Sequence, residues 1–215
     1  EDIAGIATLP VSIGIALLGR WSGKWVDRFG ARPLLTIGPI LTGIGFGLLG
    51  LVGITGGTAA YWTTFFPGIV FVSIGMGLVV APLTTAVMGS VPVSSSGTAS
   101  GINNAVSRVA GVLAVAVFGT MMINLFTASL NQRANLLPLD DDTRAFLMDE
   151  APKLAETQIP ENLADDVKLD VDNAINLSFI EAYRVVMLIM AGMAIVGGVF
   201  AFLVIDHRKL EAITY

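Results

Sequence analysis

The feature that most constrains the fold is the run 33–107, which contains no charged side chain. In a soluble domain about a quarter of the residues are charged, whereas only 13% of this 215-residue chain is charged and 54% is hydrophobic. A transmembrane helix needs about 20 consecutive apolar residues, so the run is too long for a single crossing. The sequence therefore predicts an integral membrane protein that crosses the lipid bilayer several times.

Five apolar segments are expected to cross the bilayer. Turn-forming residues at 53–58 and 91–97 divide the uncharged run into three pieces, and one further apolar segment lies on each side of it. Strands are disfavoured, because only helices or closed barrels satisfy the backbone in lipid and these runs do not alternate as barrel strands do. The predicted fold is an all-α polytopic membrane protein. Its predicted spans are 3–19, 33–53, 61–89, 98–126 and 178–205.

Positive charge in short loops sets the orientation of the helices. Residues 20–32 hold four basic residues and one acid, Asp27, so they are predicted to form a cytoplasmic loop. Residue 1 then lies outside, and the basic tail lies in the cytoplasm. Residues 1–126 are thus expected to contain four spans, and residues 178–215 the last span and the tail.

The segment 127–177 is strongly acidic, with eleven acidic and four basic residues. It is predicted to be an extracytoplasmic loop with short helices near 142–156 and 163–176. An acidic chain of this kind does not indicate nucleic-acid binding. The three acids at 140–142 lack the spacing and turn glycine of a calcium loop, so no metal site is predicted there.

A motif of five residues occupies the basic segment 20–32. From charge alone, two explanations are equally good. One is a topology anchor with Trp21 and Trp25 at the membrane interface. The other is a functional group whose carboxylate binds an arginine or a helix N-terminus. The residues of the motif are Gly23, Asp27, Arg28, Gly30 and Arg32.

This pattern resembles the cytoplasmic-loop signature of the major facilitator superfamily, G-x-L-a-D-R-x-G-R-K. The sequence departs from the signature at Trp25, where leucine is usual, and at Ala31, where arginine is usual. Residues 91–111 resemble the penultimate-helix region of the fourteen-helix drug:proton antiporters of that family. The long acidic loop before the last span also fits this branch.

The resemblance implies that the chain forms helices two to six of the C-terminal six-helix bundle of a major facilitator fold, in a bacterial inner membrane. It implies a secondary active transporter that exports hydrophobic or amphipathic drugs by proton-coupled alternating access. Asp27 is expected to bind a helix terminus in the missing N-terminal half and to latch the cytoplasmic side, with Arg28 and Arg32 as ionic neighbours. The expected partners are the lipid bilayer, a small-molecule substrate, protons and that missing half.

Arg108 follows Gly97 by about ten residues, which places it roughly 15 Å into the bilayer. An arginine at that depth is unfavourable unless it faces a partner or a wet cavity. One interpretation is a cavity-lining group near Asn103, Asn104 and Ser107 that contacts an anionic substrate or a carboxylate. The other is a structural arginine that caps carbonyls or lies near the interface. No acid lies at mid-depth in any span, so the protonation site is expected in the missing half.

Several residues carry structural predictions. Pro82 is expected to kink the third span. Glu181 and Arg184 lie three residues apart at the outer start of the last span, so they are expected to pair with each other. Glycines four residues apart are expected to let helices approach closely, the two pairs being Gly43 with Gly47 and Gly97 with Gly101.

The residue types do not indicate an enzyme. The sequence has no cysteine and one histidine, and it contains no nucleophile–base constellation, so neither a cofactor nor a metal is expected. Two alternatives to drug export stay open. One is a transporter of the same fold for a defined metabolite or organic anion, and the other is a non-transporting membrane subunit.

Overall fold

The computed structural model describes residues 2–54, 60–161 and 163–205, with side chains from residue 12 onward. All regular structure in these ranges is helical. Two short 3₁₀ helices, η2 (Val93–Ser95) and η3 (Ala151–Glu156), accompany the α-helices. The α-helices are α1 (Asp2–Phe29), α2 (Ala31–Gly50), α3 (Tyr61–Gly89), α4 (Ser96–Ala134), α5 (Asp141–Glu150) and α6 (Asp165–Val204).

Four helical segments in the described ranges are long and apolar enough to cross a membrane. They correspond to four of the five predicted spans, although α2 ends at Gly50 rather than at residue 53, and the all-α polytopic fold is confirmed. The other predicted span, 3–19, lies in α1, and much of it falls among residues whose side chains are not described. The assignment of segments to the two sides of the membrane stays a prediction. The four segments are Ala31–Gly50, Tyr61–Gly89, Val93–Ala134 and Asp165–Val204.

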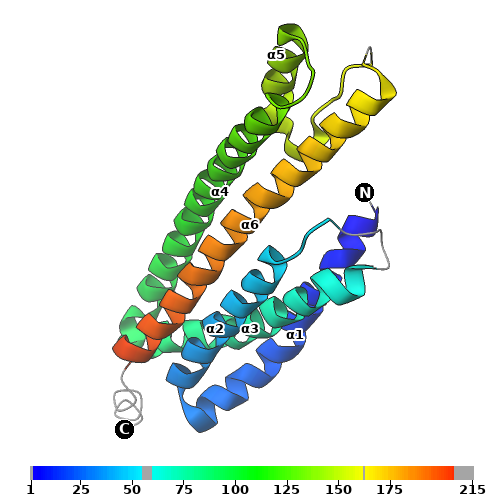
Figure 1. Cartoon of the computed structure of the whole chain (residues 1–215). Coiled ribbons are helices and arrows are strands. Elements are labelled where there is room, and N and C mark those ends of the chain that lie inside the picture. Colours follow the sequence, from blue (N-terminus) through cyan, green and yellow to red (C-terminus); the bar gives the residue numbers. More distant parts are fainter. Residues whose placement is uncertain (1, 55–59, 162, 206–215) are drawn as a thin grey trace.

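The helices form a packed group with an extension. In Figure 1, α1, α2 and α3 lie together, α6 runs along α2, and α4 lies beside α6. The far ends of α4 and α6 project beyond the group and carry α5. Helix α4 therefore meets the α1–α3 group chiefly through α6.

Glycines on α2 allow the backbones of the neighbouring helices to come into direct contact with it. A Cβ added at Gly45 would lie 2.7 Å from the carbonyl oxygen of Gly68 on α3. A Cβ added at Gly43 would lie 2.8 Å from the carbonyl oxygen of Ala191 on α6. Real Cβ atoms do not tolerate such distances, so only glycine fits. The expectation for Gly43 agrees with this packing.

The other glycines of the two predicted pairs do not make such contacts. A Cβ added at Gly47, Gly97 or Gly101 would meet no described atom within 4 Å. Four-residue spacing predicts which glycines share a helix face, but it does not say whether a second helix lies against that face. Pro82 is fully buried within the continuous helix α3, and its kink stays a prediction.

The acidic segment is folded around an apolar core. We call α5 and η3 the cap, and we name the helix ends on the side of the cap outer and those on the opposite side inner. The cap packs on the outer ends of α4 and α6, and the core contains five residues with 0% exposure. Short helices near 142–156 are present as α5 and η3, whereas 163–176 is not a separate helix but the beginning of α6. No break separates this stretch from the predicted span. The five residues are Phe126, Leu130, Leu147, Ala151 and Val171.

Two local features shape the cap. Asp140 is the N-cap of α5, and its Oδ1 accepts a hydrogen bond from the Thr143 backbone N–H at 2.9 Å. Hydrogen bonds from the Thr143 side chain and backbone hold the pKa of Asp140 below its usual value. Leu154 in η3 has φ 59° and ψ −124°, a strained conformation for a residue with a side chain. Its side chain packs against the core.

Candidate functional site

The basic motif lies mostly on a helix. Helix α1 continues to Phe29, and α2 begins at Ala31, so only Gly30 connects them. Gly30 has φ 79° and ψ 169°, a conformation that favours glycine. The prediction of a loop over 20–32 is therefore wrong for every residue of that range except Gly30. Charged side chains mark where a helix leaves the apolar region, but they do not end the helix. Within 20–32, only Gly30 interrupts the helical backbone.

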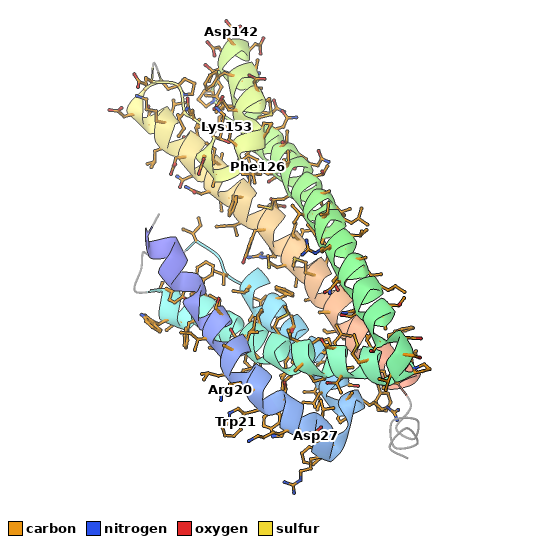
Figure 2. The ribbon with its side chains drawn as sticks, turned by 180° about the vertical axis from the view of Figure 1, so that it is seen from behind. Arg20, Trp21, Asp27, Phe126, Asp142 and Lys153 are labelled. Carbon is orange, nitrogen blue, oxygen red and sulfur yellow. The ribbon has the colours of Figure 1, made fainter. Side chains whose placement is uncertain are left out.

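Asp27 lies exposed near the C-terminal end of α1 (Figure 2). Among the described residues, no ion pair or hydrogen bond engages its carboxylate. Arg28 is also exposed, and its guanidinium carbon lies 5.3 Å from the ring centroid of Phe29. A Cβ added at Gly23 would meet nothing within 4 Å. This face of α1 is thus open to a partner from outside the described residues.

Arg32 does not form an ion pair with Asp27 and instead contacts α6. Its Nε donates a hydrogen bond to the carbonyl oxygen of Phe202 at 3.0 Å, and its guanidinium carbon lies 4.4 Å from the Phe202 ring centroid. Phe202 lies in the last turn of α6, where helix carbonyls lack intrahelical donors and favour a cation. The implied Asp27–Arg32 pairing is therefore not present in this structure. Sequence reasoning missed Phe202, because the contact joins residues 170 positions apart.

The candidate cavity residues lie on the inner half of α4. Asn103 is half-buried, whereas Asn104, Ser107 and Arg108 are exposed. Helical spacing places Asn104 and Arg108 on one face, rotated by about 100° from the face that carries Asn103 and Ser107. The structure therefore does not gather these four side chains into one cluster.

A groove of about 380 Å³ lies between the end of α3 and the beginning of α4. Asn103 is the one predicted site residue in its lining. The rest of the lining is mostly aliphatic, which suits apolar groups more than strongly polar ones. The lining consists of Val87, Val91, Ser95, Thr98, Ala99, Ile102, Asn103 and Val106.

A polar cluster joins the outer ends of α4 and α6. Glu181 Oε2 accepts hydrogen bonds from Ser129 Oγ at 2.7 Å and from Arg133 Nη2 at 3.1 Å. Arg184 Nε instead donates to the carbonyl oxygen of Gly50 on α2 at 3.1 Å. The predicted Glu181–Arg184 pair is therefore wrong, since each side chain binds a neighbouring helix. The sequence did hold a signal for the Arg133–Glu181 contact, because these opposite charges lie at the outer ends of successive spans. We call Ser129, Arg133 and Glu181 the outer polar cluster.

Comparison with known proteins identifies relatives that are named for drug resistance or drug efflux. Multidrug resistance protein Stp of Mycobacterium tuberculosis is 30% identical over 129 residues, which are 60% of this chain and 23% of Stp. Multidrug efflux pump LfrA of Mycolicibacterium smegmatis is 25% identical over 201 residues, which are 92% of this chain and 38% of LfrA. Methyl viologen resistance protein SmvA of Salmonella typhimurium is 26% identical over 157 residues, which are 73% of this chain and 31% of SmvA.

The chain spans less than two fifths of the length of each of these three relatives. A family model described as Major Facilitator Superfamily matches residues 2–130, more than half of the chain. The helical architecture and the apolar helices that are long enough to span a membrane agree with that match. The chain is therefore a member of the Major Facilitator Superfamily.

Proposed function

We propose that the chain is part of a secondary active transporter that exports hydrophobic or amphipathic drugs, driven by proton entry. The observation that carries the proposal is family membership, together with three relatives named for multidrug resistance, multidrug efflux and methyl viologen resistance. The chain contributes helices of the C-terminal bundle. The remaining helices, including the N-terminal half, complete the transporter, and rocking of the two halves gives alternating access.

The motif is proposed to work as a gate latch. Asp27 is exposed and unengaged among the described residues, so its carboxylate is free to accept from a helix N-terminus in the other half. Arg28 is its ionic neighbour. Gly30 makes the tight connection to α2, and Gly23 keeps the α1 surface free for close approach. Arg32 contributes by anchoring α2 to the end of α6.

The substrate is proposed to contact the inner half of α4. The aliphatic groove supports an apolar or amphipathic substrate, with Asn103 as its polar contact. Asn104, Ser107 and Arg108 supply further polar groups on the exposed surface. No Asp or Glu lies between Arg32 and Arg108, so the protonation site is proposed to lie in the other half.

Arg108 supports a second candidate function, transport of an organic anion. Among the described residues it makes no ion pair, and its side chain is exposed. A guanidinium suits a carboxylate or phosphate ligand more than a cationic dye. Comparing Arg108→Ala with wild type for a cationic dye and for an organic anion separates the two functions. Selective loss of anion transport would favour the second one.

The topology is proposed to place the cap outside and the motif in the cytoplasm. The sequence has no cysteine, so single introduced cysteines report on their own positions. In full-length protein freed of other cysteines, Asp142→Cys should react with an impermeant maleimide in intact cells. Lys24→Cys should react only after permeabilisation. The reverse pattern would overturn the topology.

Flux into proteoliposomes tests the proposed function. The full-length protein is reconstituted, a pH gradient is imposed and movement of a cationic amphipathic dye is followed. We expect transport that depends on the gradient and stops when a protonophore is added. Absence of dye movement under any gradient would contradict transport of this substrate class. Dye movement that the protonophore leaves unchanged would contradict proton coupling.

A further inference from the structure

We propose that Glu181 and Arg184 are positioning residues that fix the substrate-facing helix α4 relative to α2. The two side chains lie three residues apart on α6 and reach in different directions. Glu181 binds α4 through Ser129 and Arg133, while Arg184 binds the end of α2 at Gly50. The inference rests on the proposed transport function, because it assigns these residues a role in placing the groups that contact substrate.

Helix α4 is held mainly near its outer end. Residues 104–117 are all exposed in the described structure, whereas Phe126, Leu130 and Ala134 are at most 1% exposed. Arg108 and Ser129 are 21 residues apart, or about 30 Å along the helix axis. A tilt of about 2° at the outer end would therefore move Arg108 by about 1 Å.

Apolar packing alone does not fix the register of α4 against α6. Burial of Phe126 and Leu130 is favourable but non-directional, so it tolerates small shifts of one helix along the other. The bonds to Glu181 Oε2 have defined lengths of 2.7 and 3.1 Å and weaken when the geometry changes. The outer polar cluster thus selects one register among several that would bury similar area.

The contact between Arg184 and Gly50 fixes α6, and with it α4, relative to α2. Helix α6 lies at backbone distance from α2, since a Cβ added at Gly198 would lie 2.7 Å from the carbonyl oxygen of Thr36. Arg184 closes the outer end of the same interface at Gly50. A line of contacts then runs from α2 through Arg184 and Glu181 to α4. Within the described residues, no other side-chain hydrogen bond links α4 to a membrane-spanning helix.

This role differs from a contribution to stability. The side chains of Arg133 and Glu181 are 35% and 60% exposed, and ion pairs of that exposure contribute little to unfolding free energy. Loss of the cluster is therefore expected to change the position of α4 more than the stability of the protein. A merely structural role would lower the melting temperature and the amount of folded protein without changing the apparent KM.

The test measures helix position and transport in the same full-length protein, freed of other cysteines. Spin labels at Val112→Cys on α4 and Ile44→Cys on α2 report the distance between the helices. Glu181→Ala should broaden or shift that distance and raise the apparent KM by about fivefold or more. Asp141→Ala is the matched control, because Asp141 pairs with Arg144 within α5 alone, and both readouts should keep wild-type values.

Charge exchange makes the test specific. The double variant Glu181→Arg with Arg133→Glu restores opposite charges across α4 and α6, so it should recover most of the distance distribution and KM. If Glu181→Ala does not fold, Arg133→Lys replaces it, because lysine keeps the charge but loses the planar fork. Wild-type distances and KM in Glu181→Ala, or in Arg133→Lys where it replaces Glu181→Ala, would overturn the proposal. If the wild type transports no dye, the proposed function fails, and the spin-label distances alone decide on positioning.

Discussion

The guanidinium carbon of Arg32 lies 4.4 Å from the ring centroid of Phe202, and Arg32 Nε donates to the Phe202 carbonyl at 3.0 Å. The contact ties the beginning of α2 to the last turn of α6. Asp27, five residues before Arg32, has no such partner among the described residues. The motif therefore divides into a residue that anchors the bundle and a carboxylate that is free for another partner.

Replacing Arg32 should weaken the packing of α2 against the inner end of α6. Arg32→Gln removes a cation–π contact and a charge-assisted hydrogen bond, so it should lower the free energy of unfolding by about 1–2 kcal/mol. Arg32→Lys should restore only part of this, because lysine lacks the planar guanidinium. Thermal unfolding of the full-length protein in detergent measures the change. Arg28→Gln is the control, since Arg28 is exposed, and an equal loss in both variants would contradict the anchoring role.

Two buried serines at the α4–α6 interface should respond in opposite ways. Ser178 is 0% exposed and its Oγ has no hydrogen-bond partner in the described structure, whereas Ser129 Oγ donates to Glu181. Ser178→Ala removes an unsatisfied hydroxyl and should raise the free energy of unfolding by up to about 1–3 kcal/mol. Ser129→Ala should lower it by about 1 kcal/mol. The two variants are compared by thermal unfolding, and equal destabilisation would show that Ser178 has a partner.

The sequence predicted the helices well where turn chemistry marked both ends. The expected span 61–89 matches α3 at both of its ends. The prediction of helix ends failed where charge was taken as the end of a helix. Helix α1 continues through Lys24 and Asp27, and α6 begins at Asp165, well before its apolar part. An α-helix satisfies its own backbone in water as well as in lipid, so composition locates the membrane surface but not the helix end.

The site was less predictable for a different reason. Spacing along one helix suggested that Glu181 pairs with Arg184, yet their partners Arg133 and Gly50 come from other helices. Local spacing favours a pair of this kind by only about 0.2–0.5 kcal/mol, which a better-placed tertiary partner exceeds. The apolar core under the cap was missed as well, because residues such as Leu147 and Val171 are dispersed among acids.

Adding a methyl group should distinguish the packed and open glycines of α2. Gly45→Ala would place its Cβ 2.7 Å from the Gly68 carbonyl oxygen and from the Val72 nitrogen. These are backbone atoms that cannot rotate away, so the substitution should destabilise the protein by about 1–3 kcal/mol. Gly47→Ala, two residues away, meets nothing within 4 Å and should be tolerated. Melting temperatures of the two variants test this, and an equal decrease would contradict the α2–α3 packing described.

The cap should lose stability as the pH falls, in part through Asp140. The folded-state pKa of Asp140 is lowered, because its carboxylate accepts hydrogen bonds from Thr143. Its contribution is therefore fully present above the unfolded-state value and is lost as the pH falls through the folded-state pKa. Circular dichroism melting from about pH 5 to about pH 3 should show a steeper decline for wild type than for Asp140→Asn, which caps without titrating. Parallel declines would show that Asp140 does not contribute.

We propose that this chain belongs to a transporter whose inner gate depends on Asp27. The most direct measurement is proton-driven dye transport by the full-length protein carrying Asp27→Asn, at matched amounts in the membrane. Asp142→Asn is the control, because Asp142 is an exposed acid on the cap. We predict that Asp27→Asn lowers transport by about tenfold or more and that Asp142→Asn leaves it unchanged. Normal transport by Asp27→Asn would contradict the latch and leave the motif as a topology anchor.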